Sequence, residues 1–177
     1  EFIVDSGGAG LHRGGNGFDI HRFDIKKTDE NNYIILGGIK VFNVNPLIGH
    51  SDADVLMHAI TDSILGIVNK GDIGKIFPSS DKKWENADSK IFLEYAIKKM
   101  NEHQYKINNI DITIILQKPA ISEYINTMKK NVSRIVNTNI DNISIKATTT
   151  DKLGYIGNNN GIAAHAITLL THNDNKF

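Results

Sequence analysis

The segment GFDIHRF, residues 17–23, places Asp19 and His21 two positions apart within an apolar stretch that is typical of a β-strand. Side chains at positions i and i+2 of a strand project from the same face, so these two should stand together. A charge that is buried on that face needs a partner, because burial of an unpaired ion is costly. Strand periodicity leaves two partners open: a bound metal ion, or an ordinary salt bridge or hydrogen bond.

The strand that carries Asp19 and His21 is expected over residues 16–21. A hairpin and then a helix are expected after it. The segment NNYIILGGIKVF predicts a hairpin in which residues 33–36 turn through Gly37-Gly38 into residues 39–42. The next segment, residues 53–69, has the period of a helix.

One apolar stripe on this helix, formed by Leu56, Ile60 and Ile64, predicts that the helix is mostly buried. Ser51 or Asp52 is the expected N-cap, and the helix should stop at Gly71.

The rest of the chain alternates between helices and strands. Amphipathic helices are expected after Asp88 and over residues 121–138, and strands over residues 109–118, from residue 142 onward, and over 162–172. Pro119 should end the first of these strands. The pattern predicts an α+β fold: a single small domain in which helices cover one face of an approximately four-stranded mixed sheet.

The composition fits one folded domain. The 177 residues are 40% hydrophobic and 23% charged, with 20 basic and 20 acidic side chains. This balance indicates neither disorder nor a nucleic-acid-binding surface, and it favours a small-molecule or protein partner. Because the chain has no cysteine, His and carboxylate side chains are the expected ligands for any transition metal. No apolar run reaches the roughly 18 to 20 residues that span a bilayer, so no membrane segment is expected.

The chain begins with a glycine-rich stretch, EFIVDSGGAGLHRGG, that lacks an initiating Met. Residues 1–15 are therefore expected to form a flexible or processed N-terminal extension, and residues 16–177 the folded domain.

His58 is the histidine that could join Asp19 and His21, because it lies near the start of the buried helix. Three protein ligands with an open fourth position are typical of a catalytic zinc site. Asp62, four residues later on the same helix face, could hold a ring N–H of His58, although an Asp near solvent is equally ordinary. The other histidines considered are interpreted as packed or surface residues: His12, His103, His165 and His172.

Three polar segments could bind a ligand or could be simple turns. His50 and Ser51 precede a helix N-terminus, where anions are favoured, but capping explains them as well. Asp72 between glycines could hold a polyol, or could only stabilise a turn. The segment KATTTDKLGYIG offers hydroxyl groups and a carboxylate that suit phosphate oxygens and Mg²⁺, although threonine is also common in strands.

Several motifs, in this order, together resemble the 2-C-methyl-D-erythritol 2,4-cyclodiphosphate synthase family of the non-mevalonate isoprenoid pathway. They are GFDIHRF, GHSDADVLMHAITDSILG, GDIGKIFP, ADS, DITIILQKP and IKATTTDKLGYIG, and the resemblance runs from about Gly17 to about Leu170. It implies a homotrimer with active sites between subunits. It also implies that the 2-phosphate of 4-diphosphocytidyl-2-C-methyl-D-erythritol 2-phosphate attacks the β-phosphorus, so that the cyclic diphosphate forms and CMP leaves.

The resemblance also implies roles for individual residues. Asp19, His21 and His58 would bind Zn²⁺, Asp151 would bind Mg²⁺ or Mn²⁺, and His50 and Thr149 would stabilise the transition state. The further residues implied to bind substrate are Asp19, His21, His50, Ser51, Asp72, Ile73, Gly74, Phe77, Ser79, Ser80, Asp81, Leu116, Ala120, Ile121, Ser122, Thr148, Thr149, Thr150, Asp151 and Tyr155. The chain departs from the family pattern at Asp151, Ala120, Asn158 and Asn160, where Glu, Lys, Arg and Glu are usual.

Two other functions remain open from the sequence. A non-catalytic trimer could bind a metal or a cytidine nucleotide, and a metal-dependent phosphodiesterase would release a linear product instead of a cyclic one. The bias toward Asn, Lys and Ile favours an apicoplast-like plastid stroma, with the bacterial cytoplasm as the alternative.

Overall fold

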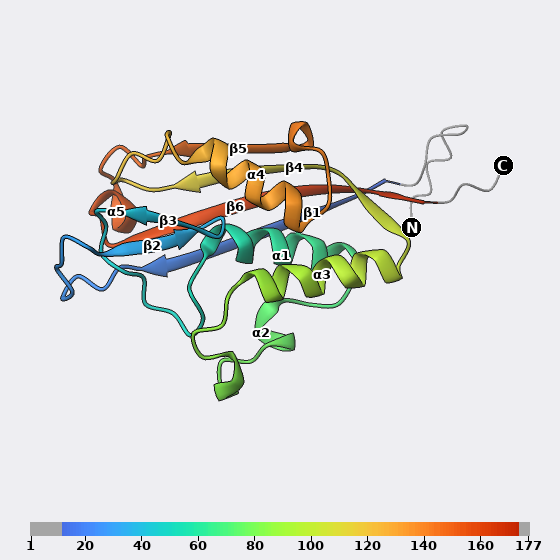
Figure 1. Cartoon of the computed structure of the whole chain (residues 1–177), viewed down its shortest axis with the longest axis horizontal. Coiled ribbons are helices and arrows are strands. Elements are labelled where there is room, and N and C mark those ends of the chain that lie inside the picture. Colours follow the sequence, from blue (N-terminus) through green and yellow to red (C-terminus); the bar gives the residue numbers. More distant parts are fainter. Residues whose placement is uncertain (1–11, 174–177) are drawn as a thin grey trace.

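A four-stranded mixed sheet forms the centre of the computed structural model, which describes residues 12–173 (Figure 1). The strand order is β1-β6-β4-β5; β6 is antiparallel to both neighbours, and β4 is parallel to β5. The strands are β1 (His12–Arg22), β4 (Tyr105–Ile115), β5 (Ile143–Thr148) and β6 (Gly161–His172). A separate hairpin pairs β2 (Tyr33–Leu36) with β3 (Ile39–Phe42), as the sequence predicts.

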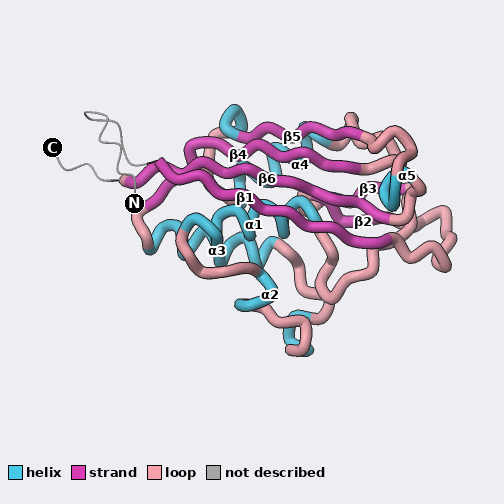
Figure 2. The backbone as a smooth tube through the Cα atoms, turned by 180° about the vertical axis from the view of Figure 1, so that it is seen from behind, coloured by secondary structure: helices cyan, strands magenta, loops and turns pink. Residues whose placement is uncertain are grey.

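The main helices cover one face of this sheet, which confirms the predicted α+β class (Figures 1 and 2). They are α1 (Val55–Ile67), α3 (Lys90–Glu102) and α4 (Ile125–Ile135), with α4 joining the parallel strands β4 and β5. Short helical turns complete the chain: α2 (Ile73–Ile76), α5 (Gly154–Gly157), and two 3₁₀ turns at Lys82–Trp84 and Ile140–Asn142. Within the described residues, no helix is long and apolar enough to cross a membrane.

Two glycines of β1 allow α1 to lie directly on the strand. A Cβ atom at Gly17 would lie 1.8 Å from the carbonyl oxygen of Ala59, and one at Gly15 would lie 2.0 Å from that of Ser63. Any side chain at these positions would push the helix away. The backbone of α1 therefore rests on β1, and its predicted apolar stripe is fully buried in the core.

The N-cap of α1 is Asp54, so the prediction of Ser51 or Asp52 was wrong. The Asp54 side chain accepts hydrogen bonds from the backbone N–H groups of Leu56 (3.1 Å) and Met57 (3.0 Å). It also accepts from the N–H groups of Gly37 (3.0 Å) and Gly38 (2.7 Å) in the β2–β3 turn. A fully buried carboxylate needs such donors, and here they fix the hairpin to the start of α1.

The remaining boundaries differ by a few residues from those expected. The helix α1 ends at Ile67, and the chain reverses at Asn69, whose φ is +53°, two residues before the expected stop at Gly71. The strand β1 begins at His12 because it pairs with β6 as far as Thr171, so residues 12–15 belong to the sheet. The rest of the predicted N-terminal extension lies outside the described residues.

Within residues 12–173, the other face of the sheet carries no helix and exposes apolar side chains. Phe18 is 56% exposed, Ile20 46% and Ile167 52%, and all three lie on the adjacent strands β1 and β6. An apolar band of this kind on a sheet is typical of a surface that another chain covers.

Candidate active site

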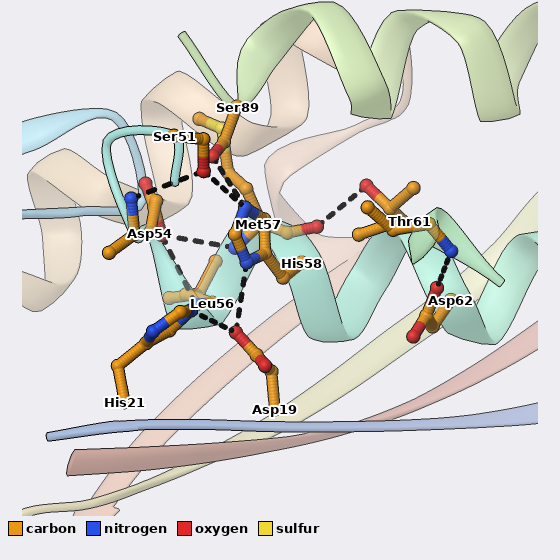
Figure 3. A network of polar contacts seen from close by, with 12 residues as sticks. Asp19, His21, Ser51, Asp54, Leu56, Met57, His58, Thr61, Asp62 and Ser89 are labelled. Carbon is orange, nitrogen blue, oxygen red and sulfur yellow. Dashed lines mark hydrogen bonds and ion pairs between the residues drawn. The ribbon is translucent and has the colours of Figure 1, made fainter. Parts of the chain in front are cut away.

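Asp19, His21 and His58 meet at one point, where the edge strand β1 passes under the first turn of α1 (Figure 3). The Asp19 Oδ2 atom lies 3.2 Å from His21 Nε2 and 2.9 Å from His58 Nδ1. The three candidate ligand atoms lie within 4.8 Å of one another. The predicted cluster of two histidines and a carboxylate is thus confirmed, and Gly17 is what brings α1 close enough to form it.

The partners of His21 show that a proton or a metal ion must lie between it and Asp19. The Nδ1–H of His21 donates to the carbonyl oxygen of Ile48 (3.0 Å), because a carbonyl can only accept. A neutral His21 therefore directs the lone pair of Nε2 at the carboxylate of Asp19. Two facing lone pairs repel each other unless a proton or a metal ion lies between them. The donor set, two nitrogens and one carboxylate oxygen, suits a zinc ion.

The contacts within the cluster shift the pKa values of Asp19 and His21 in the direction that keeps both ionised. Burial by itself would raise the pKa of Asp19, but hydrogen bonds from His21 and His58 hold that pKa well below its usual range. Burial by itself would lower the pKa of His21, but its hydrogen bond and attraction to Asp19 raise the pKa above the ordinary value. A raised pKa means that His21 tends to keep a proton on the Nε2 atom that faces Asp19. A metal ion that binds here would replace that proton.

Asp62 makes no hydrogen bond to His58, so the suggested role for it was wrong. Its Oδ1 atom accepts the backbone N–H of Ile73 (2.8 Å) and so fixes the start of α2. The Nε2 atom of His58 instead lies 2.8 Å from the Ser89 hydroxyl and 3.2 Å from the Ser51 hydroxyl. The sequence offered ADS as a motif but no local pattern that links Ser89 to His58.

A cavity of about 410 Å³ opens beside the three candidate ligands. Its lining includes most of the substrate-binding residues predicted for this half of the molecule: His50, Ser51, Asp72, Ile73, Gly74, Phe77, Ser79 and Ser80. Asp81 lies next to them, because His50 Nε2 donates to its carbonyl oxygen (3.2 Å). Asp72 has both roles considered for it, since it lines the cavity and also caps α2 by accepting the N–H of Lys75 (2.8 Å).

Aromatic side chains form one wall of this cavity. The ring of Phe77 packs against those of Phe92 (centroids 4.6 Å apart) and Trp84 (4.8 Å), and the ring of Phe92 packs against that of His58 (5.9 Å). Sequence reasoning included Phe77 but missed Trp84 and Phe92, because each comes from a different loop or helix. Trp84 is the single tryptophan of the chain, so its fluorescence should report on this cavity.

The second group of predicted site residues lies at the opposite edge of the sheet. Asp19 pairs with Ala164, Ala164 with Ile114, and Ile114 with Ala147, so these four residues form one row across the sheet. Three strand spacings of about 4.8 Å separate β1 from β5, which amounts to roughly 14 Å. The segment 148–151, which follows β5, is therefore at the same end of the sheet as the histidines but at the far edge.

The loops at that far edge contact each other. The Lys152 N–H donates to the Gln117 side chain (3.2 Å), and the Asp151 N–H donates to the Thr149 hydroxyl (3.2 Å). Leu116 and Ile121 are only 4% and 3% exposed, so their side chains belong to the core. The other residues predicted to bind substrate here lie at or near the surface: Ala120, Ser122, Thr148, Thr149, Thr150 and Asp151. Tyr155 is exposed too, but it lies on the β1 side of the sheet, where it lines a separate pocket with Arg22 and Phe23.

Comparison with known proteins identifies the family. The YgbB family model matches residues 12–171. The 2-C-methyl-D-erythritol 2,4-cyclodiphosphate synthase of Clostridioides difficile is 49% identical over 148 residues, which cover 84% of this chain and 92% of that protein. A CDP complex of IspF from Plasmodium falciparum superposes with a TM-score of 0.79 at 38% identity, covering 91% of this chain and 96% of that one.

The bifunctional IspDF of Campylobacter jejuni superposes with a TM-score of 0.85 at 36% identity. The match covers 93% of this chain but only 43% of that longer protein. The chain belongs to the YgbB family, among relatives that are named 2-C-methyl-D-erythritol 2,4-cyclodiphosphate synthase.

Proposed function

We propose that this chain cyclises 4-diphosphocytidyl-2-C-methyl-D-erythritol 2-phosphate to the 2,4-cyclodiphosphate and releases CMP, a step of the non-mevalonate isoprenoid pathway. The observation that carries the proposal is the Asp19–His21–His58 cluster, which could hold a metal ion and faces a cavity lined by hydroxyl, imidazole and aromatic groups. In the reaction, an oxygen of the 2-phosphate bonds to the β-phosphorus. The bond from that phosphorus to the oxygen shared with the α-phosphorus breaks, and CMP carries that oxygen away.

The residues of the cavity bind and orient the substrate. Asp19, His21 and His58 would hold zinc, which supplies a positive charge that polarises a bound phosphate. His50 and Ser51 offer hydrogen-bond donors to the phosphate on the cavity side, and Asp72 offers a carboxylate oxygen to the polyol hydroxyls. No protein nucleophile is required, because both reacting groups belong to one substrate, so positioning and charge neutralisation carry the rate.

The diphosphate and cytidine would be bound by the loops at the far sheet edge. Thr148–Asp151 offer hydroxyl groups and one carboxylate, which suit phosphate oxygens and a Mg²⁺ or Mn²⁺ ion. Leu116 and Ile121 have buried side chains, so this segment would contact a base through its backbone and through Ala120 and Ser122.

We also propose that the chain acts as a homotrimer whose active sites lie between subunits. The zinc cluster and the Thr148–Asp151 loop of one chain are separated by about the width of the sheet, roughly 14 Å, which is too far for one phosphate to touch both. A loop from a neighbouring chain would close this gap. The exposed apolar band of Phe18, Ile20 and Ile167 offers the surface for such an assembly.

The cellular compartment is a prediction that rests on composition. The bias toward Asn, Lys and Ile favours a plastid stroma, while one similar protein comes from the bacterium Clostridioides difficile and another from Plasmodium falciparum.

The test is a turnover assay with the proposed substrate, Zn²⁺ and Mg²⁺, in which ³¹P NMR follows the products. We expect a cyclic diphosphate and stoichiometric CMP, and loss of both in a His58→Ala variant that is still folded. A linear hydrolysis product would instead identify a phosphodiesterase. Binding of CDP without turnover would identify a non-catalytic nucleotide-binding protein.

A further inference from the structure

Ser89 stands at the N-cap of α3 but does not cap it. A serine at this position normally accepts an N–H group of the first helical turn. Here the side chain of Asp88 accepts the N–H of Lys90 instead (2.8 Å). Ser89 is fully buried, and its hydroxyl is directed at the loop before α1 and at His58 (Figure 3).

Asp52 holds Ser89 by two hydrogen bonds. The Ser89 hydroxyl donates to Asp52 Oδ1, and the backbone N–H of Ser89 donates to Asp52 Oδ2 (3.1 Å). A carboxylate only accepts, so the single hydrogen of the hydroxyl is used there. The Ser89 oxygen, 2.8 Å from His58 Nε2, must then accept a hydrogen from that nitrogen.

This chain of contacts requires a hydrogen on His58 Nε2. Without a metal, Nδ1 also donates, because it lies 2.9 Å from Asp19 Oδ2 at the centre of the cluster and a carboxylate only accepts. With Nε2–H fixed, loss of the Nδ1 hydrogen leaves a lone pair on Nδ1 that would face a bound cation. The same logic applies to His21, where the Ile48 carbonyl oxygen fixes the hydrogen on the nitrogen that faces away from Asp19.

We propose that Asp52 and Ser89 are positioning residues for the metal centre: they fix the Nε2–H tautomer and the ring orientation of His58, so that Nδ1 is presented to the cation. The inference rests on the proposed function, because zinc is its ligand. Metal-bound histidines generally need such a partner, and loss of it typically costs 10- to 100-fold in metal affinity.

The two serines near His58 have different roles on this view. Ser89 is closer to Nε2 than Ser51 is, 2.8 Å against 3.2 Å, and it is fully buried. Ser51 lines the cavity. Ser89 holds His58, and Ser51 is left to contact a bound phosphate.

The first experiment compares Ser89→Ala with Ser51→Ala as the matched control. Each variant removes one of the two hydroxyl groups that lie near His58 Nε2. Metal-free protein would be titrated with zinc in competition with a chromophoric chelator. We expect Ser89→Ala to weaken zinc binding about 10- to 100-fold and Ser51→Ala to change it by less than about threefold.

The second experiment reads directly, in the metal-free chain and by ¹⁵N NMR of histidine, whether His58 Nε2 carries a hydrogen. In Asp52→Asn the amide can donate to Ser89, whose hydroxyl is then free to donate to Nε2. We expect a hydrogen on His58 Nε2 in the wild type, whether or not Nδ1 also carries one, and a shift toward the form with hydrogen on Nδ1 alone in Asp52→Asn, with weaker zinc binding. If Ser89→Ala fails to fold, Asp52→Asn still tests whether Asp52 and Ser89 position His58.

Two results would overturn the proposal: a folded Ser89→Ala chain with wild-type zinc affinity, or an unchanged tautomer in Asp52→Asn. A wild-type chain that bound no zinc would remove the proposed function. The NMR measurement separates the two, because it needs no metal, and a His58 Nε2 without hydrogen in the wild type would contradict the positioning role by itself.

Discussion

The contact between Gly17 and α1 makes the sharpest prediction, because a single methyl group at this position should separate the metal ligands. In Gly17→Ala the new Cβ would lie 1.8 Å from the Ala59 carbonyl oxygen, whereas ordinary contact begins at 3.4 Å. Ala59 directly follows His58. The substitution should therefore move His58 away from Asp19 and His21 without altering any ligand.

The size of the effect follows from that overlap. Strand and helix would have to separate by roughly 1.6 Å, the difference between 3.4 Å and 1.8 Å, whereas metal–ligand distances tolerate only about 0.2 Å. Because the clash is with backbone, the cost should reach the upper end for overpacking, about 3 kcal/mol. For a chain of this size that lowers Tm by roughly 6–12 °C. We expect zinc affinity to fall by at least about 100-fold. This is a larger fall than the one that follows the loss of a partner that only orients a ligand.

Gly14→Ala is the matched control, since it makes the same change on the same strand. A Cβ at Gly14 meets no atom within 4 Å. Chelator competition would measure zinc affinity, calorimetry would measure Tm, and Trp84 fluorescence would report on the cavity. The reasoning is refuted if Gly17→Ala keeps the Tm and zinc affinity of Gly14→Ala.

Three further predictions concern pH, assembly and subunit sharing. Burial raises the pKa of Asp54 from 3.8 to about 6, so between these pH values the native state binds more protons than the unfolded state. The free energy of unfolding should therefore fall as pH rises through this window, by on the order of 3 kcal/mol. Urea unfolding of the wild type relative to Asp54→Asn would measure it, and a difference between the two chains that does not change with pH would contradict this. Phe18→Asp should give monomers in sedimentation while zinc affinity is kept, and an unchanged trimer would exclude the exposed band as the interface. Inactive Asp19→Ala and Thr149→Ala chains should partly recover activity when refolded together, whereas no recovery would place both halves of the site in one chain.

Local patterns predicted most of the elements correctly. The alternation around Asp19 and His21 indicates a strand, and the stripe through Leu56 indicates a buried helix, because each depends only on residues a few positions apart. The boundaries were less predictable. Asp54 was missed as the N-cap of α1 because two of its four donors belong to Gly37 and Gly38, which are distant in sequence.

The sequence by itself determined which residues could bind a cation: it put Asp19 and His21 on one face of a strand and His58 on a helix that could pack against it. Only the tertiary structure decided what surrounds that cation. It gave His58 the partner Ser89 instead of Asp62, and it placed Thr148–Asp151 at the opposite edge of the sheet. The physical reason is range: periodicity is set by neighbours along the chain, whereas a hydrogen-bond partner and a strand order are set by the packing of segments that lie far apart in sequence.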